Sequence, residues 1–185
     1  SADGGALNSF ANYHNALSLA LAGKFADAES ILADRDAYVS RGSILAHVQI
    51  LAELGRRDDA LDLLMTGAGV SLQDRVADKL RKALSNDGPV GFDIINTPSD
   101  AVSEVFLILA DAINGDNSPR LALFFARLAE NMQPENTEAL LLIAQILSEQ
   151  DQHLLAIEAY QSVPADDPFA TNVTIGLAGA FQRND

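Results

Sequence analysis

The sequence has 185 residues, which is room for one ordinary domain or one short repeat array. Hydrophobic residues make up 48% and charged residues 21%, so the chain can bury a core and does not belong to the disordered class. The 12 Lys and Arg against 26 Asp and Glu give a net charge of −14, which disfavours nucleic acid and acidic membrane surfaces as partners. The chain has no Cys, which excludes disulfides, thiolate metal sites and Cys nucleophiles.

The hydropathy pattern argues against membrane insertion. No apolar run approaches the roughly 20 residues of a membrane-spanning helix. No basic segment followed by an apolar one opens the chain, so no signal peptide is visible. We expect Ser1–Gly5 to be a disordered N-terminal segment, and a signal sequence can have been removed before it. The composition leaves both an exported and a cytoplasmic location open.

Residues 1–66 carry two helix hairpins. Gly23 and Gly55 each follow an apolar helical stretch, and each is followed five residues later by an alanine, Ala28 or Ala60. A glycine can take the left-handed conformation that ends a helix, and the alanine lets the next helix approach closely. The four helices are expected over Phe10–Ala22, Asp27–Ala33, Ile44–Leu54 and Asp58–Met65.

The pattern changes over residues 67–100, where we expect one irregular helix and a connector. The helix, Ser71–Leu84, opens with a capping box in which Asp74 is the third helical residue. Its apolar residues recur every four positions, at Leu72, Val76, Leu80 and Leu84. Val90–Asn96 is predicted to be an extended or irregular connector.

Residues 101–185 repeat with a period of 34 residues. The positions that match at this spacing are Ala110 and Ala144, Ala122 and Ala156, Ala126 and Tyr160, and Pro134 and Pro168. We therefore assign repeats to Ser103–Asn136 and Thr137–Ala170, followed by the first helix of another repeat from Thr171. Prolines 98, 119 and 168 mark helix starts. Since no segment shows period-two alternation, the chain is predicted to be all-α, with about nine or ten helices.

These repeats resemble the tetratricopeptide repeat (TPR), a 34-residue pair of helices. The match rests on small residues and a terminal proline at equivalent positions of the two adjacent repeats, although Val163 is larger than the pattern. Residues 1–66 resemble two looser pairs, in which Val48 is again larger. The resemblance implies a right-handed α-α superhelix, a solenoid of helix hairpins, that runs through residues 1–66, 67–100 and 101–185 as a single continuous array.

A narrower resemblance links Tyr13–Ala20, Ala46–Leu51 and Glu104–Phe106 to larger exported bacterial TPR proteins of unassigned function. It implies that the chain is an internal piece of a longer array, and it favours an exported location over a cytoplasmic one. The last helix indicates the same, because a solenoid ends in a polar capping helix and Ile175 and Phe181 are apolar.

The sequence carries no strong catalytic or metal-binding signature. His14 and His47 fall on first helices of the hairpins, but no pair of ligands at i, i+4 supports a metal site. Asp58, Asp59 and Asp62 form an acidic cluster that favours a solvated helix face over general acid–base chemistry. We therefore expect no catalytic residue, no metal and no cofactor.

In TPR arrays the first helices of successive repeats line a concave groove, and the resemblance places a partner-binding groove on this chain. The implied groove residues are Phe10, Tyr13, His14, Leu17, Leu45, Gln49, Glu53, Glu104, Leu107, Ile108, Asp111, Glu138, Leu141, Leu142, Gln145 and Glu149. An apolar floor with acidic sides suits an extended or helical peptide of neutral to basic character. The alternative is that these carboxylates are only solvated.

Charge is unevenly distributed along the chain. Residues 1–100 hold 9 basic and 14 acidic side chains, whereas residues 101–185 hold 3 and 12. Between Leu128 and Gln182 there is no Lys or Arg against eight carboxylates. We expect this part to attract a cationic partner and to lose affinity for it at high salt.

The sequence therefore predicts a non-catalytic protein–protein interaction scaffold that binds a peptide or protein segment in the groove. The groove lacks the Lys and Asn residues with which TPR cochaperones hold acidic chaperone tails, so that partner class is not expected. Two alternatives stay open: an accessory region of a larger secretion or enzyme assembly, and self-association through the apolar C-terminal helix.

Overall fold

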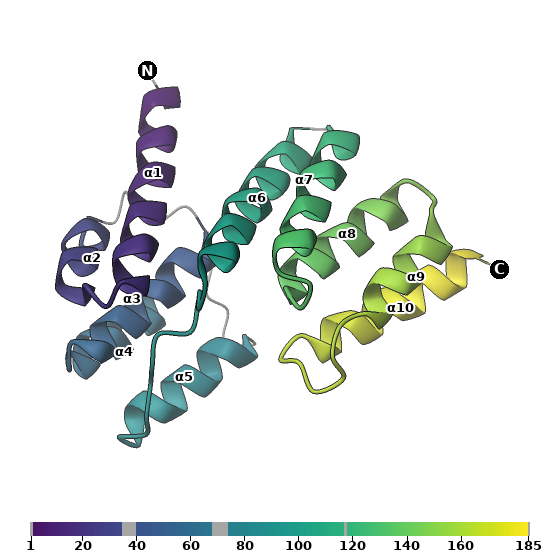
Figure 1. The fold of residues 1–185 in the computed structure, drawn as a ribbon. Helices are drawn as coiled ribbons and strands as arrows, with labels where there is room; N and C mark the ends of the chain where they lie inside the picture. Colours follow the sequence, from purple (N-terminus) through teal and green to yellow (C-terminus); the bar gives the residue numbers. More distant parts are fainter. Residues whose placement is uncertain (1, 35–39, 68–73, 117, 185) are drawn as a thin grey trace. The chain divides into compact units, whose positions relative to one another are not determined.

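The computed structural model describes residues 2–34, 40–67, 74–116 and 118–184, and these residues form ten α-helices and no β-strand (Figure 1). The prediction of an all-α chain is therefore confirmed. In chain order the helices are α1 (Ala2–Leu21), α2 (Phe25–Leu32), α3 (Arg41–Glu53), α4 (Arg57–Thr66), α5 (Arg75–Ser85), α6 (Pro98–Gly115), α7 (Pro119–Met132), α8 (Thr137–Glu149), α9 (His153–Gln161) and α10 (Ala170–Asn184). The chain forms two compact units, residues 1–101 and 102–185, which we call unit 1 and unit 2.

Three helix hairpins close with the same turn. At Gly23 and Gly55 the backbone is left-handed, with φ of 73° and 74°, as the glycine pattern predicts. At the α3–α4 turn the Arg56 N–H donates to the Leu51 carbonyl at 2.8 Å, which is the long hydrogen bond of a Schellman cap. The α8–α9 turn has the same geometry, with Asp151 at φ 57° in the place of the glycine.

Helix α3 lies at the centre of unit 1. Every side chain over Ser43–Leu51 is buried, including those of the polar residues Ser43, His47 and Gln49, so this stretch of the helix is covered on all sides. The helix contacts both α2 and α4. Its apolar cluster continues through Ala60 of α4 to Leu84 of α5, so a single core joins the second hairpin to the helix after it.

Helix α5 begins at Arg75, later than predicted. Asp74 is its N-cap, and the Asp74 carboxylate accepts hydrogen bonds from two backbone N–H groups of the first turn at 3.0 and 3.1 Å. The predicted capping box, with Asp74 inside the helix, is therefore wrong; Ser71 and Leu72 lie outside the described residues. Arg41 also donates two hydrogen bonds to Asp74, one at 2.8 Å, and this contact across 33 residues fixes where the helix starts.

Small residues bring the helices of unit 2 together. The alanines singled out by the 34-residue period, Ala110, Ala122, Ala126, Ala144 and Ala156, are fully buried, and so is Ala129. Helices α6 to α9 each contribute at least one of them to a shared cluster. Tyr160 and Val163, the larger residues of the second repeat, are buried as well. The period therefore marks the packed face of each helix correctly.

The last helix, α10, begins at Ala170, one residue before the predicted Thr171 and two residues after Pro168, a predicted helix start; α6 and α7 begin at the predicted prolines. The carboxylate of Asp167 explains the delay. It accepts hydrogen bonds from the Phe169 N–H at 2.8 Å and from the Thr137 hydroxyl at 2.7 Å. These bonds hold the chain around Pro168 in a turn on the first residue of α8.

Candidate functional site

The predicted groove residues of unit 1 lie mostly in the protein interior. Very little surface, 2% or less, is exposed at Tyr13, Leu17, Leu45 and Gln49. Phe10 and His14 are half-buried, and Glu53 is exposed. The expectation that these side chains line an open groove needs correction here, because the chain itself covers most of them.

The cover on α3 is the connector that leads from α5 to α6, which runs as a stretched segment in Figure 1. Its main chain is held by two side chains of α3 that belong to the predicted groove. The Asp93 N–H donates to the Gln49 side-chain oxygen at 2.9 Å, and the Phe92 N–H donates to the Glu53 carboxylate at 3.1 Å. The Gln49 amide nitrogen donates in return to the Asp93 carboxylate. The side-chain amide of Gln49 and the carboxylate of Glu53 thus accept hydrogen bonds from two consecutive backbone N–H groups.

Apolar side chains of the connector complete its seat. Ile95 is 2% exposed, and Val90 and Ile94 pack against the core of unit 1. The ring of Phe92 lies 6.1 Å from the ring of Phe25 at the start of α2, measured between centroids. An extended chain directs successive side chains to opposite sides, so one segment can combine buried anchors with exposed polar groups. The connector is therefore held on α3 by hydrogen bonds to its main chain and by apolar side chains, the two kinds of contact by which proteins bind extended peptides.

The predicted groove residues of unit 2 are more accessible. Leu107 is buried, while half-burial is found for Glu104, Ile108, Glu138, Leu141 and Leu142. Asp111, Gln145 and Glu149 are exposed. On α8 the Gln145 amide donates to the Glu149 carboxylate at 2.9 Å, so these two side chains contact each other.

Helices α3 and α8 carry the same short sequence at this position. Residues 49–53 read Gln-Ile-Leu-Ala-Glu, and residues 145–149 read Gln-Ile-Leu-Ser-Glu. Each stretch ends two residues before the left-handed turn residue, Gly55 or Asp151. The Gln–Glu pair of α3 is used by the connector, and the pair of α8 is exposed at the surface.

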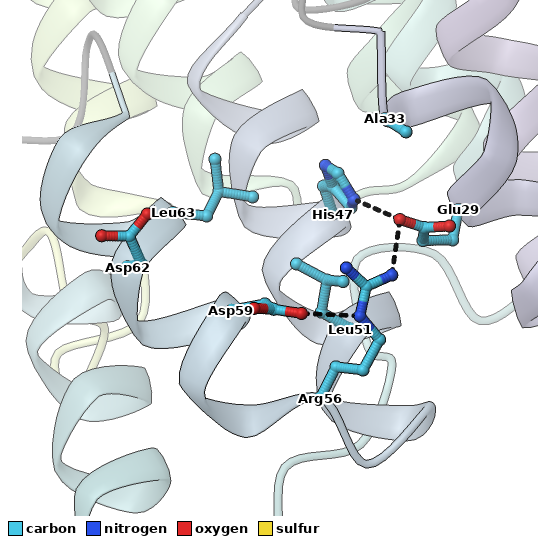
Figure 2. Close-up of a pocket in the computed structure, with 8 residues that line it drawn as sticks. All are labelled: Glu29, Ala33, His47, Leu51, Arg56, Asp59, Asp62 and Leu63. Carbon is cyan, nitrogen blue, oxygen red and sulfur yellow. Dashed lines mark hydrogen bonds and ion pairs between the residues drawn. The ribbon is translucent and has the colours of Figure 1, made fainter.

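Unit 1 also has a polar pocket of about 210 Å³ between α2, α3 and α4 (Figure 2). Arg56 connects two of its walls by donating hydrogen bonds to Glu29 at 2.8 Å and to Asp59 at 2.7 Å. His47 Nε2 lies 3.9 Å from the Glu29 carboxylate, and Asp62 lies on the far side of the pocket in the figure. Exposed ion pairs of this kind contribute little to stability, and this one ties α2 to the α3–α4 turn.

The histidines of unit 1 are neutral at pH 7. Burial lowers the pKa of His47 from 6.5 to about 4; the Glu29 carboxylate opposes this effect and Arg56 adds to it. Burial also lowers the pKa of His14 to about 4, and its ring lies 4.3 Å from that of Phe10. The Glu29 carboxylate, 3.9 Å from His47 Nε2, is also paired with Arg56, so the cluster links α2 and α3 to the α3–α4 turn.

Neither a metal centre nor a membrane helix can be placed in the described residues. Over those ranges no three His, Asp or Glu side chains gather in a way that could hold a metal ion, and no helix combines the length and apolar character needed to cross a membrane. No protein-family model matches this chain, and no curated protein sequence matches it either.

The sequence analysis identified Gln49 and Glu53 but did not predict that they bind the main chain of the connector at Phe92 and Asp93. The partner segment lies about 40 residues further along the chain and has no regular secondary structure, so no periodicity connects it to α3. The identical Gln-Ile-Leu-x-Glu stretches were the available signal, because they stand at the same distance from the two turn residues.

Proposed function

We propose that this protein is a non-catalytic scaffold of helix hairpins, a TPR-like solenoid, whose first-helix faces bind extended segments of other proteins. The observation that supports this most is the seat of the connector on α3. There a helix face already holds an extended chain through side chain-to-main chain hydrogen bonds and apolar anchors. In this mode of peptide recognition, hydrogen bonds to the peptide backbone give affinity, and pockets for the peptide side chains give specificity.

The charge of unit 2 supports a neutral to basic partner. Its exposed first-helix residues include Asp111 and Glu149, and no Lys or Arg occurs between Leu128 and Gln182. A cationic segment would be drawn to this surface, more strongly at low salt than at high salt. Nucleic acid would be repelled.

Selection from a displayed library of random peptides on the immobilised chain tests this function. We expect enriched sequences that share apolar anchors, and part of the captured pool should be lost between roughly 0.05 and 0.5 M salt. Charge reversal by Glu138→Lys with Glu149→Lys should remove much of the capture, whereas an equal reversal away from the first helices, Glu158→Lys with Asp166→Lys, should not. Enrichment no greater than that on a blank surface would overturn the proposal.

A second candidate function is self-association through α10. Ile175 and Phe181 of this helix expose 70% and 50% of their surface, which is unusual for large apolar side chains. In this case the chain would act as an accessory region of a larger assembly. Light scattering across a dilution series distinguishes the two, because a chain that stays monomeric at high concentration does not bury α10 against a second copy.

A further inference from the structure

The exposed Gln–Glu pair of α8 is an open copy of the site that the connector fills on α3. We propose that Gln145 and Glu149 bind an extended segment of a partner protein with the sequence aromatic, Asp or Asn, then aliphatic. The Gln145 side-chain oxygen and the Glu149 carboxylate would accept hydrogen bonds from two consecutive backbone N–H groups of that segment. This inference rests on the proposed function and names the site and the class of partner.

The two pairs occupy equivalent positions in their hairpins. The two residues that follow the Gln are buried in both helices, Ile50 and Leu51 in α3 and Ile146 and Leu147 in α8. The partner helix begins after the same turn in each case, and its first buried alanine, Ala60 or Ala156, is fully enclosed. Since burial follows the same register, the Gln and Glu side chains leave each hairpin on the same face.

The difference between the copies lies in what their side chains contact. Gln49 is 2% exposed and is bonded to Asp93, whereas Gln145 is exposed and donates to Glu149 of its own helix. A hydrogen bond between exposed side chains four residues apart on a helix is weak. An incoming segment can therefore replace it, with its backbone N–H groups bonding the Gln oxygen and the Glu carboxylate as on α3.

The chemistry of the connector defines the partner. Gln49 needs an acceptor side chain at the position of Asp93, and Asn offers one as well as Asp does. The aliphatic position corresponds to Ile94, and half-buried Leu141 and Leu142, about one turn before Gln145, offer apolar surface for it. Because unit 2 is strongly acidic, a segment with Asn should bind more tightly than the same segment with Asp.

The test uses the full chain and a fluorescein-labelled peptide with the sequence of residues 88–97, GPVGFDIINT, together with the same peptide carrying Asn for Asp. We expect both to bind saturably by fluorescence anisotropy, the Asn form more tightly. Gln145→Ala and Glu149→Ala should each weaken binding about tenfold, the loss expected for one or two hydrogen bonds.

Two controls separate the sites and the hypotheses. Glu158→Ala removes the same charge from the exposed side of α9 and should leave affinity unchanged. Circular dichroism should show full helicity for the Gln145 and Glu149 variants, because both side chains are exposed. Absence of saturable binding to either peptide, or binding that does not depend on Gln145 and Glu149, would overturn the inference. Library peptides that bind independently of this pair would leave the scaffold function standing while this site is rejected.

Discussion

Helices α3 and α8 carry the same five-residue pattern and use it differently. On α3 the pair is closed: Gln49 is buried beneath the connector and bonded to it. On α8 the pair is open: Gln145 and Glu149 are exposed, and the Gln145 amide donates to Glu149 of its own helix. The same short sequence therefore contributes to the fold where a segment lies over it, on α3, and remains accessible where its side chains are exposed, on α8.

The largest expected difference between the two helices depends on pH. Two residues before the pair, α3 has His47 and α8 has Ile143, both buried. The pKa of His47 is about 4 when folded and near 6.5 when unfolded, so between these values the unfolded chain binds the proton more readily. Acidification from pH 7 to pH 4 should therefore lower the free energy of unfolding, by at most about 3 kcal/mol through this residue.

Urea unfolding of the wild type and of His47→Ile at several pH values checks this prediction. The variant should lose much of the dependence on pH while keeping the part that comes from His14, whose pKa is lowered in the same direction. Glu29 and Arg56 should be kept unchanged, because both act on His47. Equal pH dependence in wild type and variant would contradict the assigned burial.

Removing the glutamine from each copy should have unequal effects on stability. Gln49→Ala removes two hydrogen bonds to Asp93 and the packing of a side chain that is 2% exposed, and it should cost about 2 kcal/mol. Gln145→Ala removes an exposed hydrogen bond and should change stability by less than about 0.5 kcal/mol. Chemical denaturation of both variants measures this difference, and similar losses would mean that the α8 pair is not open.

Exchanging the residue types at the turns after the two helices should change stability by smaller amounts, in opposite directions at the two turns. Gly55 and Asp151 have similar left-handed φ, and an added Cβ at Gly55 meets nothing within 4 Å. Backbone strain is therefore the main difference between them, because the exposed Asp151 carboxylate has only a 3.7 Å surface contact with His153. Gly55→Asp should cost about 1 kcal/mol, and Asp151→Gly should gain up to about 1 kcal/mol. Thermal melts of the two variants should shift in opposite directions; shifts of the same sign would argue against equivalent turns.

Much of the fold was predictable because its determinants are local or periodic. The left-handed glycines and the buried alanines such as Ala110 and Ala144 follow from spacing alone. The start of α5 was not predictable, because Ser71 and Asp74 are both good caps and the choice depends on Arg41. The use of Gln49 was hidden for the same reason, since its partner Asp93 is 44 residues away.

The candidate site was predicted in part. The resemblance named both Gln–Glu pairs, but it placed buried side chains such as Tyr13 and Leu45 on an open surface. Apolar residues on a first helix fit a groove floor and a packed core equally well, and the local sequence does not distinguish them. Only the covering segment does, and it is distant in the chain.

One measurement compares the open and closed copies directly. A nitrogen-15 NMR titration of the full chain with the Asn form of the connector peptide follows the side-chain amide signals of Gln49 and Gln145 in the same sample. The Gln145 signals should shift progressively and saturate, while the Gln49 signals, already bonded to Asp93, should stay in place. Unchanged Gln145 signals at saturating peptide, or equal shifts at both residues, would contradict the division into one open and one closed site.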